Sequence, residues 1–435
     1  MSLACSRRIS PCSSKRRALE VMSWPPSRVH SSMFSNVVTP RRISVAESGG
    51  PLAGVVVVDF GMNIAGPYAA SVLSDFGADV IKVEGPGGDS GRDYPPSPGG
   101  VSSLFASVNH GKRYLGLDLR QPGARPVIES LCEHADVVIQ NLRPGKAAEL
   151  GIDAASCHRV NPRLVHCSVE AFYPDDGARP GYDLMVQAES GLLGLTGEEH
   201  GGPCRTPGSI LDHVTSLWVA LGAMAALSGK RSCETITVTM LDVAMALLND
   251  RASAFVATGE APRRMGSSLA TTTPHRVYPT SDGDLVVGAP NDGLFRKLAA
   301  LVGPPVEGDD RFADQTGRLA HRGELDEMLE RVFRTDTTAA WLQRLDLAGI
   351  PAAHVRDLAD AVDRHRALSA TGFCDLEGIA GLSIVAPPVR IGADPWQPPV
   401  PGPVGADNRS VLSGLLGFDS SAVDRLTEEG IVVAP

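Results

Sequence analysis

The chain has 435 residues, of which 43% are hydrophobic, and a formal net charge of −10. This length allows one large hydrophobic core or two smaller ones, since domains usually span roughly 100–200 residues. The first 50 residues hold eight Lys and Arg against two Glu, so the rest carries a net charge of about −16 and would repel nucleic acid. The longest apolar run outside the predicted strands, near Leu217–Leu227, is shorter than the ~20 residues of a membrane-spanning helix. We therefore expect neither nucleic acid nor a membrane as a partner.

Residues 1–50 are basic and rich in serine, and they lack the apolar stretch of a secretory signal. This composition fits a mitochondrial transit peptide, but also a disordered or artefactual tail from an over-extended start, with Met22 and Met33 as internal starts. We favour the tail and expect a cytoplasmic protein, with a mitochondrial one as the alternative. The eight cysteines show no CxxC pair and no spacing with His typical of a metal site, which predicts reduced thiols and no metal.

Strands and helices alternate from residue 51 onward. Residues 52–60 form a β-branched run between turn residues, without polar alternation, which is typical of a buried parallel strand. A helix at Tyr68–Phe76 and a second strand at 78–84 follow. Further strands are predicted at Tyr114–Leu119, Asp136–Gln140 and Arg163–Val169, and a helix is predicted at Pro126–His134. The alternation predicts an α/β fold with a large doubly wound parallel sheet.

The second half of the chain begins with helical segments. A buried helix is predicted at His213–Ser228, closed by Gly229, and another at Leu241–Ala257. A smaller α/β domain follows, with a strand and three amphipathic helices predicted at 284–288, 292–302, 322–333 and 339–348. The proline-rich stretch from Val385 to Pro403 predicts an extended connector before a final helix at Asn408–Leu416.

Several common catalytic motifs are missing. The stretch Gly61–Gly66 follows the first strand but is neither a GxGxxG fingerprint nor a P-loop, and no GxSxG or HExxH motif is present. Asp212 leads a predicted helix, where the residues alone favour a capping role. The unpaired N–H groups and positive dipole at a helix start would also favour ionisation of Asp212. An ionised carboxylate is one of the nucleophiles that enzymes use.

A series of linked motifs resembles the class III CoA-transferases, the family of formyl-CoA transferase, carnitine CoA-transferases and α-methylacyl-CoA racemase. The shared segments are 51–60, 65–67, 75–84, 109–113, 117–119, 135–141, 143–145, 161–163, 181–183, 187–188, 190–191 and 196–197. The similarity covers roughly residues 51–425. It implies an enzyme of the EC 2.8.3 type that moves coenzyme A from an acyl-CoA donor to a carboxylic acid acceptor. Coenzyme A is then a substrate, and no permanently bound cofactor is expected.

The resemblance gives roles to individual residues. Asp212, in the segment Gly208–Asp212, matches the nucleophile that forms an aspartyl anhydride and then an aspartyl-CoA thioester. The positions that match the family's CoA contacts are Ile64, Ala65, Arg113, Leu117, Arg120, Asn141 and Leu142. Arginine side chains pair well with phosphates, although on the residues alone Arg113 and Arg120 read as a solvated surface pair.

Two segments depart from the family's pattern. The glycine-rich loop that closes over the site and stabilises oxyanions matches Arg264–Ser268, which keeps only Gly266. The turn at Ser228–Glu234 also differs, which predicts a local change between helix and strand. The acyl pocket is not defined by the sequence, and Met185, Trp218 and Met265 are candidates for its apolar lining. For Trp218 a place in the core is favoured.

Two alternative functions stay open. The racemase branch of the family uses a histidine and an aspartate as acid and base, but Tyr182 stands where the histidine would precede Asp183. Because tyrosine has a pKa near ~10, it is a weak base at neutral pH, and a transferase is favoured. Tyr182, Asp183 and Gly266 are candidate pocket residues, Asp183 also being a possible helix cap. A non-catalytic CoA-binding protein is the second alternative, which the retained Asp212 disfavours.

The resemblance implies an interlocked homodimer of two-domain subunits. The large CoA-binding domain would span residues 51–260 and be completed by 372–435, with a small domain at 261–371 and a tail at 1–50. The expected partners are acyl-CoA, a carboxylic acid and a second copy of the chain.

Overall fold

The computed structural model describes residues 49–173, 179–229, 234–389 and 396–435. The expected tail and most of the unusual turn at 228–234 lie outside the described residues, as does part of the proline-rich connector. The strands are β1 Val56–Asp59, β2 Asp79–Glu84, β3 Lys112–Gly116, β4 Val137–Gln140, β5 Val165–Glu170, β6 Glu234–Thr239, β7 His275–Pro279, β8 Asp284–Gly288, β9 Ala352–His354, β10 Phe373–Asp375 and β11 Ser383–Val385.

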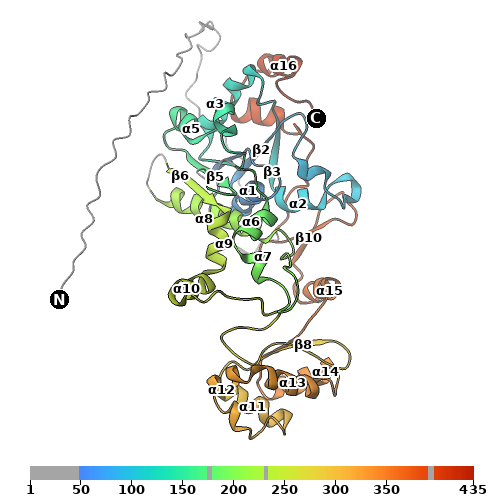
Figure 1. The fold of residues 1–435 in the computed structure, drawn as a ribbon. Helices are drawn as coiled ribbons and strands as arrows, with labels where there is room; N and C mark the ends of the chain where they lie inside the picture. The colour runs from blue at the N-terminus through green and yellow to red at the C-terminus, as the bar shows by residue number, and fades with distance from the viewer. Residues whose placement is uncertain (1–48, 174–178, 230–233, 390–395) are drawn as a thin grey trace, which may run out of the picture. The chain divides into compact units, whose positions relative to one another are not determined.

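Helices connect most of these strands (Figure 1). The α-helices of the first part are α1 Ala65–Asp75, α2 Ser103–Asn109, α3 Arg125–His134, α4 Lys146–Leu150, α5 Ala154–Val160, α6 Asp183–Glu189, α7 Leu192–Leu195, α8 Ile210–Ser228, α9 Met240–Leu247 and α10 Asn249–Thr258. The later ones are α11 Asp292–Val302, α12 Gln315–Ala320, α13 Arg322–Phe333, α14 Thr338–Leu347, α15 Leu358–Leu368 and α16 Ser420–Glu428. A short π-helix, η5, spans Ser410–Leu415.

The main sheet has six parallel strands in the order β3-β2-β1-β4-β5-β6. The chain runs outward from β1 to β3 and then returns to the other side of β1 with β4, so the sheet is doubly wound. Strands β1 and β4 are buried along their whole length, as their β-branched composition predicts for central parallel strands. The expected α/β fold with a large parallel sheet is confirmed.

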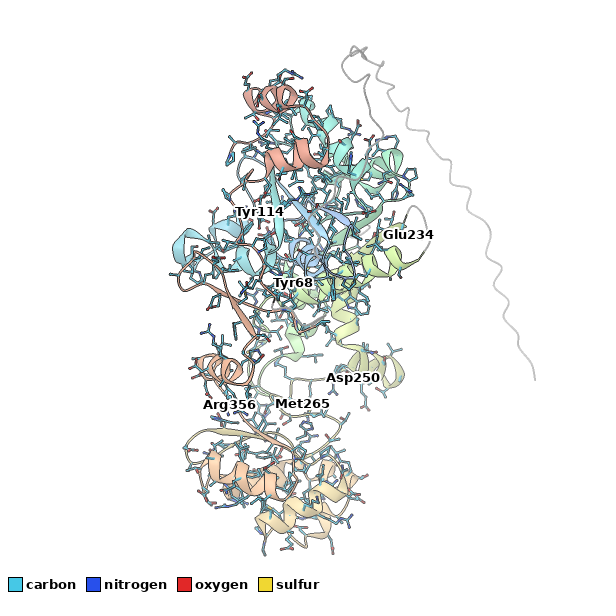
Figure 2. The ribbon with its side chains drawn as sticks, turned by 180° about the vertical axis from the view of Figure 1, so that it is seen from behind. Tyr68, Tyr114, Glu234, Asp250, Met265 and Arg356 are labelled. Carbon is cyan, nitrogen blue, oxygen red and sulfur yellow. The ribbon has the colours of Figure 1, made fainter. Side chains whose placement is uncertain are left out.

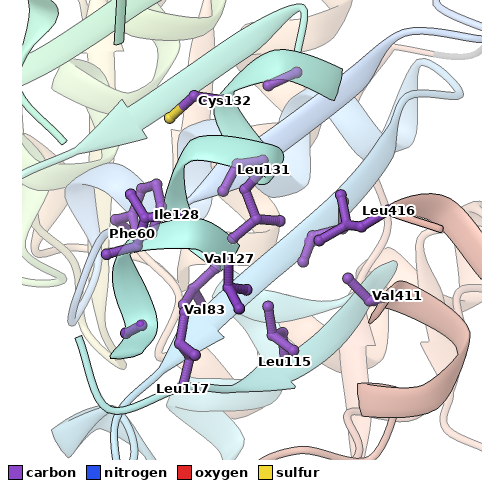
Figure 3. Close-up of a cluster of buried hydrophobic side chains, with 14 of the residues drawn as sticks. Phe60, Val83, Leu115, Leu117, Val127, Ile128, Leu131, Cys132, Val411 and Leu416 are labelled. Carbon is purple, nitrogen blue, oxygen red and sulfur yellow. The ribbon is translucent and has the colours of Figure 1, made fainter. Parts of the chain in front are cut away.

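Alternate residues of β1 enter two separate hydrophobic clusters, one on each face of the sheet. Val56 and Val58 pack with α3, α5 and the C-terminal segment. Val57 packs with α1, α6, α8 and α9 on the other face. Figure 3 shows Val411 and Leu416 of the C-terminal segment in the first of these clusters, together with helix α3. The last part of the chain therefore completes the core of the first part.

The C-terminal segment also covers the edge strand β3. The side chain of Asp407 accepts a hydrogen bond from the backbone N–H of Tyr114, and Asn408 accepts one from Gly116. A β-bridge joins Leu117 to Val432. Unpaired N–H groups on an edge strand invite aggregation, and these contacts satisfy them.

A second sheet is antiparallel, in the order β7-β8-β9, and it has a hydrophobic cluster of its own. Tyr278 and Leu285 of this sheet pack against Phe333 of α13 and Trp341 of α14. Strands β10 and β11 form a separate hairpin. The domain boundaries given by the resemblance stay a prediction.

The helices from residue 210 to residue 258 differ from the sequence-based expectations. Helix α8 begins at Ile210, three residues earlier than expected, which places Asp212 within its first turn. The helix expected at Leu241–Ala257 is broken at Leu248, between α9 and α10. Helix α8 also has the length and composition of a membrane span. One of its faces, with Leu211, Val219 and Ala223, packs within the α/β core, as a core helix does.

Candidate active site

The first half of the site lies at the switch point of the sheet, where the loops after β1 and β4 meet. The backbone N–H of Met62 donates to the side-chain oxygen of Asn141 at 2.8 Å, and the Asn141 amide donates back to the carbonyl of Met62 at 2.8 Å. Gly66 lies so close to Asn141 and Gly61 that a side chain there would be crowded. The carboxyl ends of parallel strands at such a point form a crevice that binds ligands in α/β proteins.

Buried ion pairs hold this switch-point loop from below. Lys82 donates to the carbonyl of Gly61 at 2.6 Å and to Asp89 at 2.7 Å, and Lys112 donates to Asp59 at 2.9 Å. All four charged side chains are almost fully buried. Two cations thus face two carboxylates, and Asp89 also accepts the backbone N–H of Asn63. This balanced arrangement fixes the path of the loop that leads into α1.

Burial and neighbouring charges act in opposite directions on the two lysines. Burial alone would lower the pKa of Lys82, but the carboxylates of Asp59, Asp89 and Glu84 raise it above its ordinary value. Burial lowers the pKa of Lys112 to about 8, with Asp59 opposing that change and Lys82 adding to it. Lys82 therefore stays protonated to a higher pH than Lys112.

The second half of the site is the start of helix α8. Within the described residues, two non-glycine residues have a left-handed backbone, Asn63 in the switch-point loop and Ser209 immediately before α8. Such strained positions cluster at functional sites. The hydroxyl oxygen of Ser216 lies 2.7 Å from the carbonyl oxygen of Ala65 and 2.8 Å from that of Asp212, so the two carbonyls share its one O–H donor. This one side chain joins the switch-point loop to the turn that carries Asp212.

Asp212 is partly buried, and its pKa is raised to about 7. The largest cause is desolvation by burial, and the negative charge of Asp183 adds to it, whereas Arg205 acts in the opposite direction. The expectation that the helix start would favour ionisation of Asp212 is therefore wrong in its direction. Burial and a second carboxylate outweigh the helix end, so the carboxylate that remains at neutral pH is unusually basic.

Asp183 does not line an open pocket, because only 3% of its surface is exposed. Its carboxylate accepts the backbone N–H of Leu211 at 2.8 Å and the side-chain amide of Gln187 at 2.6 Å. Gln187 in turn accepts both the backbone N–H and the hydroxyl of Thr206. Gln187 belongs to the shared segment 187–188, but sequence reasoning assigned it no role, although its position four residues after Asp183 on one helix would have paired the two. Tyr182 lies beside them but points outward, with 61% of its surface exposed.

The predicted CoA-binding positions fall into three groups. Ile64, Ala65, Asn141 and Leu142 come together in the loops at the switch point. Leu117 and Arg120 follow the carboxyl end of β3, where Leu117 is fully buried and Arg120 is exposed and paired with Asp118.

Arg113 differs, because it lies near the amino end of β3, where its guanidinium pairs with Asp79 at the start of β2. The structure does not bring Arg113 to the switch point. Its place favours the surface pair that the residues alone indicate, and its contact with CoA stays a prediction.

The segment around Gly266 lies between α10 and β7 and packs against the loop that follows α7. The backbone N–H of Gly266 donates to the carbonyl of Gly197 at 3.1 Å, and Arg264 donates to the carbonyls of Gly194 and Gly201. Met265 of this segment is labelled in Figure 2. No hydrogen bond or ion pair joins Gly266 to Asp212 within the described residues, and its N–H is already engaged. The expected role of Gly266 over the active site stays a prediction.

The structure is an α/β protein in which the loops at the switch point of the sheet are joined through Ser216 to the turn that carries Asp212. The sequence profile of CoA-transferase family III matches residues 52–408. The chain is 30% identical to a succinyl-CoA:glutarate CoA-transferase of Mus musculus, over 91% of this chain and 93% of the relative. It is 33% identical to an acetyl-CoA:oxalate CoA-transferase of Acetobacter aceti, over 73% and 84%.

A solved structure agrees with these relatives. The fold is similar to that of a CAIB/BAIF family protein from Brucella suis, with a TM-score of 0.74, 29% identity, and coverage of 84% of this chain and 99% of that one. The chain belongs to CoA-transferase family III. It is an acyl-CoA:carboxylate CoA-transferase of the EC 2.8.3 type, and the predicted family is confirmed.

Proposed function

We propose that Asp212 is the covalent nucleophile of coenzyme A transfer. The observation that carries this proposal is the place of Asp212, in the first turn of α8 and joined through Ser216 to Ala65 of the switch-point loop. A basic carboxylate beside a ligand crevice is suited to attack a thioester carbonyl. The raised pKa of about 7 makes the ionised form a better nucleophile than an ordinary aspartate.

The reaction proceeds through four acyl transfers. The Asp212 carboxylate attacks the thioester carbonyl of the donor, which forms a mixed anhydride and releases the CoA thiolate. The thiolate attacks the Asp212 carbonyl, which forms an aspartyl-CoA thioester and releases the donor acid as a carboxylate. The acceptor carboxylate attacks this thioester, which forms a second anhydride and again frees the thiolate. Attack of the thiolate on the acceptor's carbonyl gives the new acyl-CoA and restores Asp212.

The crevice at the switch point is the proposed place for coenzyme A. Ile64, Ala65, Asn141 and Leu142 belong to the segments that meet there, and Arg120, which pairs with Asp118, offers a cation beyond the carboxyl end of β3, two strands away from β1. Phosphates bind well at helix starts and beside arginine, and α1 begins at Ala65. Coenzyme A is handled as a substrate, without a permanently bound cofactor.

The acceptor is proposed to be a short dicarboxylic acid. The mouse and Acetobacter aceti relatives are named for transfer to glutarate and oxalate. Arg205 precedes α8, is half-exposed, and donates one hydrogen bond to Ser209 at 3.3 Å. Its guanidinium also forms an ion pair with Asp183 at 3.8 Å but makes no further hydrogen bond within the described residues, so its exposed N–H groups can receive a carboxylate of the substrate.

A homodimer is also part of the proposal. Trp218, expected in the core, is 47% exposed, and Leu217 and Leu221 beside it on α8 are exposed to a similar degree. Phe255 of α10 is 46% exposed. Exposed large apolar side chains on two helices are typical of an interface between subunits. A cytoplasmic location, or a mitochondrial one if residues 1–50 act as a transit peptide, remains the expectation.

The test of the proposed function is an exchange assay with purified full-length protein. Succinyl-CoA and acetyl-CoA serve as donors, glutarate and oxalate as acceptors, and new acyl-CoA is measured by chromatography. Wild type should catalyse exchange, and Asp212→Asn should lose at least about a thousandfold in kcat, as is usual for a nucleophile. Asp360→Asn changes an exposed first-turn aspartate of α15 and should behave as wild type. Comparable rates for Asp212→Asn and wild type would disprove the role of Asp212.

A further inference from the structure

Helix α8 begins without a cap of its own. Its capping position, Ser209, has a left-handed backbone and makes no side-chain bond to the first turn. The helices that start at Ala154, Asp292 and Leu358 instead use the side chain immediately before them. The first N–H groups of any helix need acceptors. In α8 the acceptor comes from another helix, because Asp183 of α6 binds the N–H of Leu211 at 2.8 Å.

Asp183 is itself held in place. Gln187, one turn further along α6, donates to it at 2.6 Å, and Gln187 is fully buried. The other end of the Gln187 amide accepts the hydroxyl of Thr206 at 2.8 Å. The network therefore ties α6, the segment before α8 and the first turn of α8 to one another. A buried polar network with every member satisfied fixes a single arrangement.

The network also places a negative charge next to Asp212. The groups that face this turn are Asp183 from α6, Arg205 from the preceding segment, His213 of α8 itself and Tyr68 from α1, whose ring meets that of His213 at 5.2 Å. The guanidinium of Arg205 is 3.8 Å from Asp183 and half-exposed, so solvent weakens its effect. The ring of His213 binds the carbonyl of Ser209. The first turn of α8 thus carries one carboxylate, Asp212, and meets a second, Asp183, with one partly screened cation nearby.

We propose that Asp183, supported by Gln187, is a positioning residue that holds the first turn of α8 and keeps a negative charge beside the nucleophile. The proposal rests on the proposed role of Asp212. Acylation turns the Asp212 carboxylate into a neutral anhydride or thioester, so the repulsion between the two carboxylates ends when the covalent bond forms. Asp183 thus favours the covalent intermediates over the free enzyme, without touching the substrate.

Two substitutions separate charge from geometry. Asp183→Asn keeps the size and one acceptor oxygen for the N–H of Leu211, loses the acceptor for Gln187, and removes the charge. The acidic limb of the kcat/KM profile should therefore move to lower pH by about one unit, because a like charge no longer opposes ionisation of Asp212. Its kcat should fall about tenfold or more, with the KM for acyl-CoA within about twofold, since the loss lies in the chemical step. Asp183→Glu keeps the charge and displaces the cap, so kcat should fall while the limb stays in place.

Two further variants complete the design. Gln187→Leu removes the support and should lower kcat by a smaller factor without moving the limb. Asp153→Asn is the matched control, because Asp153 caps α5 through the N–H of Ser156. Its kcat and its limb should remain those of wild type, and thermal unfolding verifies that each variant is folded.

The outcomes distinguish the two proposals. A wild-type enzyme that forms no covalent adduct on Asp212 with acyl-CoA disproves the proposed function. A wild type that forms the adduct, together with an Asp183→Asn enzyme that keeps the wild-type kcat and limb, disproves only the positioning role. If Asp183→Asn does not fold, Asp183→Glu and Gln187→Leu decide, and wild-type kcat values in both overturn the proposal.

Discussion

The two loops that meet at the site have similar backbones and opposite electrostatics. Each carries a left-handed non-glycine residue, Asn63 in one and Ser209 in the other, close to the start of a helix. Beneath the first loop, two buried lysines face Asp59 and Asp89. Beside the second, the two carboxylates Asp183 and Asp212 share one half-exposed arginine.

The difference follows from what each loop must do. A loop that receives an anionic ligand needs a fixed shape, and compensated buried charges provide it once all partners are present. A nucleophilic carboxylate needs basicity, which an uncompensated neighbour and partial burial provide. Loss of any one partner would destabilise the first arrangement, whereas the second costs stability at neutral pH with all its members present. Conflicts of the second kind are expected at functional sites.

The largest expected effect comes from removal of one cation from the buried ion pairs beneath the switch-point loop. Lys82→Met leaves Asp59 and Asp89 without their shared cation, and removal of one partner from a buried pair usually destabilises by about 3–5 kcal/mol. The free energy of unfolding, measured with urea, should fall by that amount. Lys146→Met removes the cation of the exposed pair with Glu149 and should change it by less than about 1 kcal/mol. Equal losses in the two variants would show that burial of Lys82 carries no special weight.

The next prediction concerns the pH dependence of the wild type. Asp212, with a pKa of about 7, is ionised and reactive above that pH and protonated below it. The kcat/KM for acyl-CoA should therefore fall about tenfold for each pH unit below about 6. Initial rates from pH 4.5 to 8.5 in buffers of constant ionic strength measure this limb. A profile that stays flat down to pH 5 would mean that Asp212 has the pKa of an ordinary aspartate.

A smaller effect is expected in the stability of Asp212→Asn. A carboxyl group whose pKa is raised in the folded state contributes stability at low pH, and this contribution is lost as pH rises through about 7. The amide lacks this dependence, so at pH 8 the variant should be more stable than wild type by about 1–2 kcal/mol, with the difference vanishing near pH 4. Unfolding in urea at both pH values measures it. A variant less stable than wild type at pH 8 would contradict this account.

The smallest effect sharpens the assignment of the ligand crevice. Arg120 lies beyond the carboxyl end of β3, and Arg113 near its amino end. Arg120→Ala should raise the KM for acyl-CoA about three- to tenfold, and Arg113→Ala should change it less than about twofold. A larger rise in KM for Arg113→Ala than for Arg120→Ala would place coenzyme A at the amino ends of the strands.

Much of the fold could be predicted from the sequence because buried parallel strands have a simple signature. The β-branched runs that form β1, β2 and β4 fit few structures other than a buried strand. Their alternation with helices predicts the parallel sheet. The start of α8 was placed three residues late, because Asp212 resembles a cap whereas the cap comes from Asp183, 28 residues earlier in the chain. Such a contact is tertiary, and no local pattern contains it.

The site could be predicted in part, and for a similar reason. Ile64, Ala65, Asn141 and Leu142 follow strands that end at the same edge, and the structure brings them together. The displacement of Arg113 could have been foreseen, since the second residue of a strand lies far from its carboxyl end. The exposure of Trp218 could not, because the apolar faces of α8 look alike in the sequence whether they meet the core or another surface.

The most direct test of the central claim is to locate the covalent adduct. Enzyme mixed with succinyl-CoA is quenched in acid, digested and analysed by mass spectrometry, with hydroxylamine in a parallel sample to convert the activated carboxyl to a hydroxamate. The account predicts the coenzyme A adduct, and the hydroxamate that replaces it, on the peptide that contains Asp212, and neither in Asp212→Asn. An adduct on a different side chain, or continued turnover by an enzyme that forms none, would contradict it.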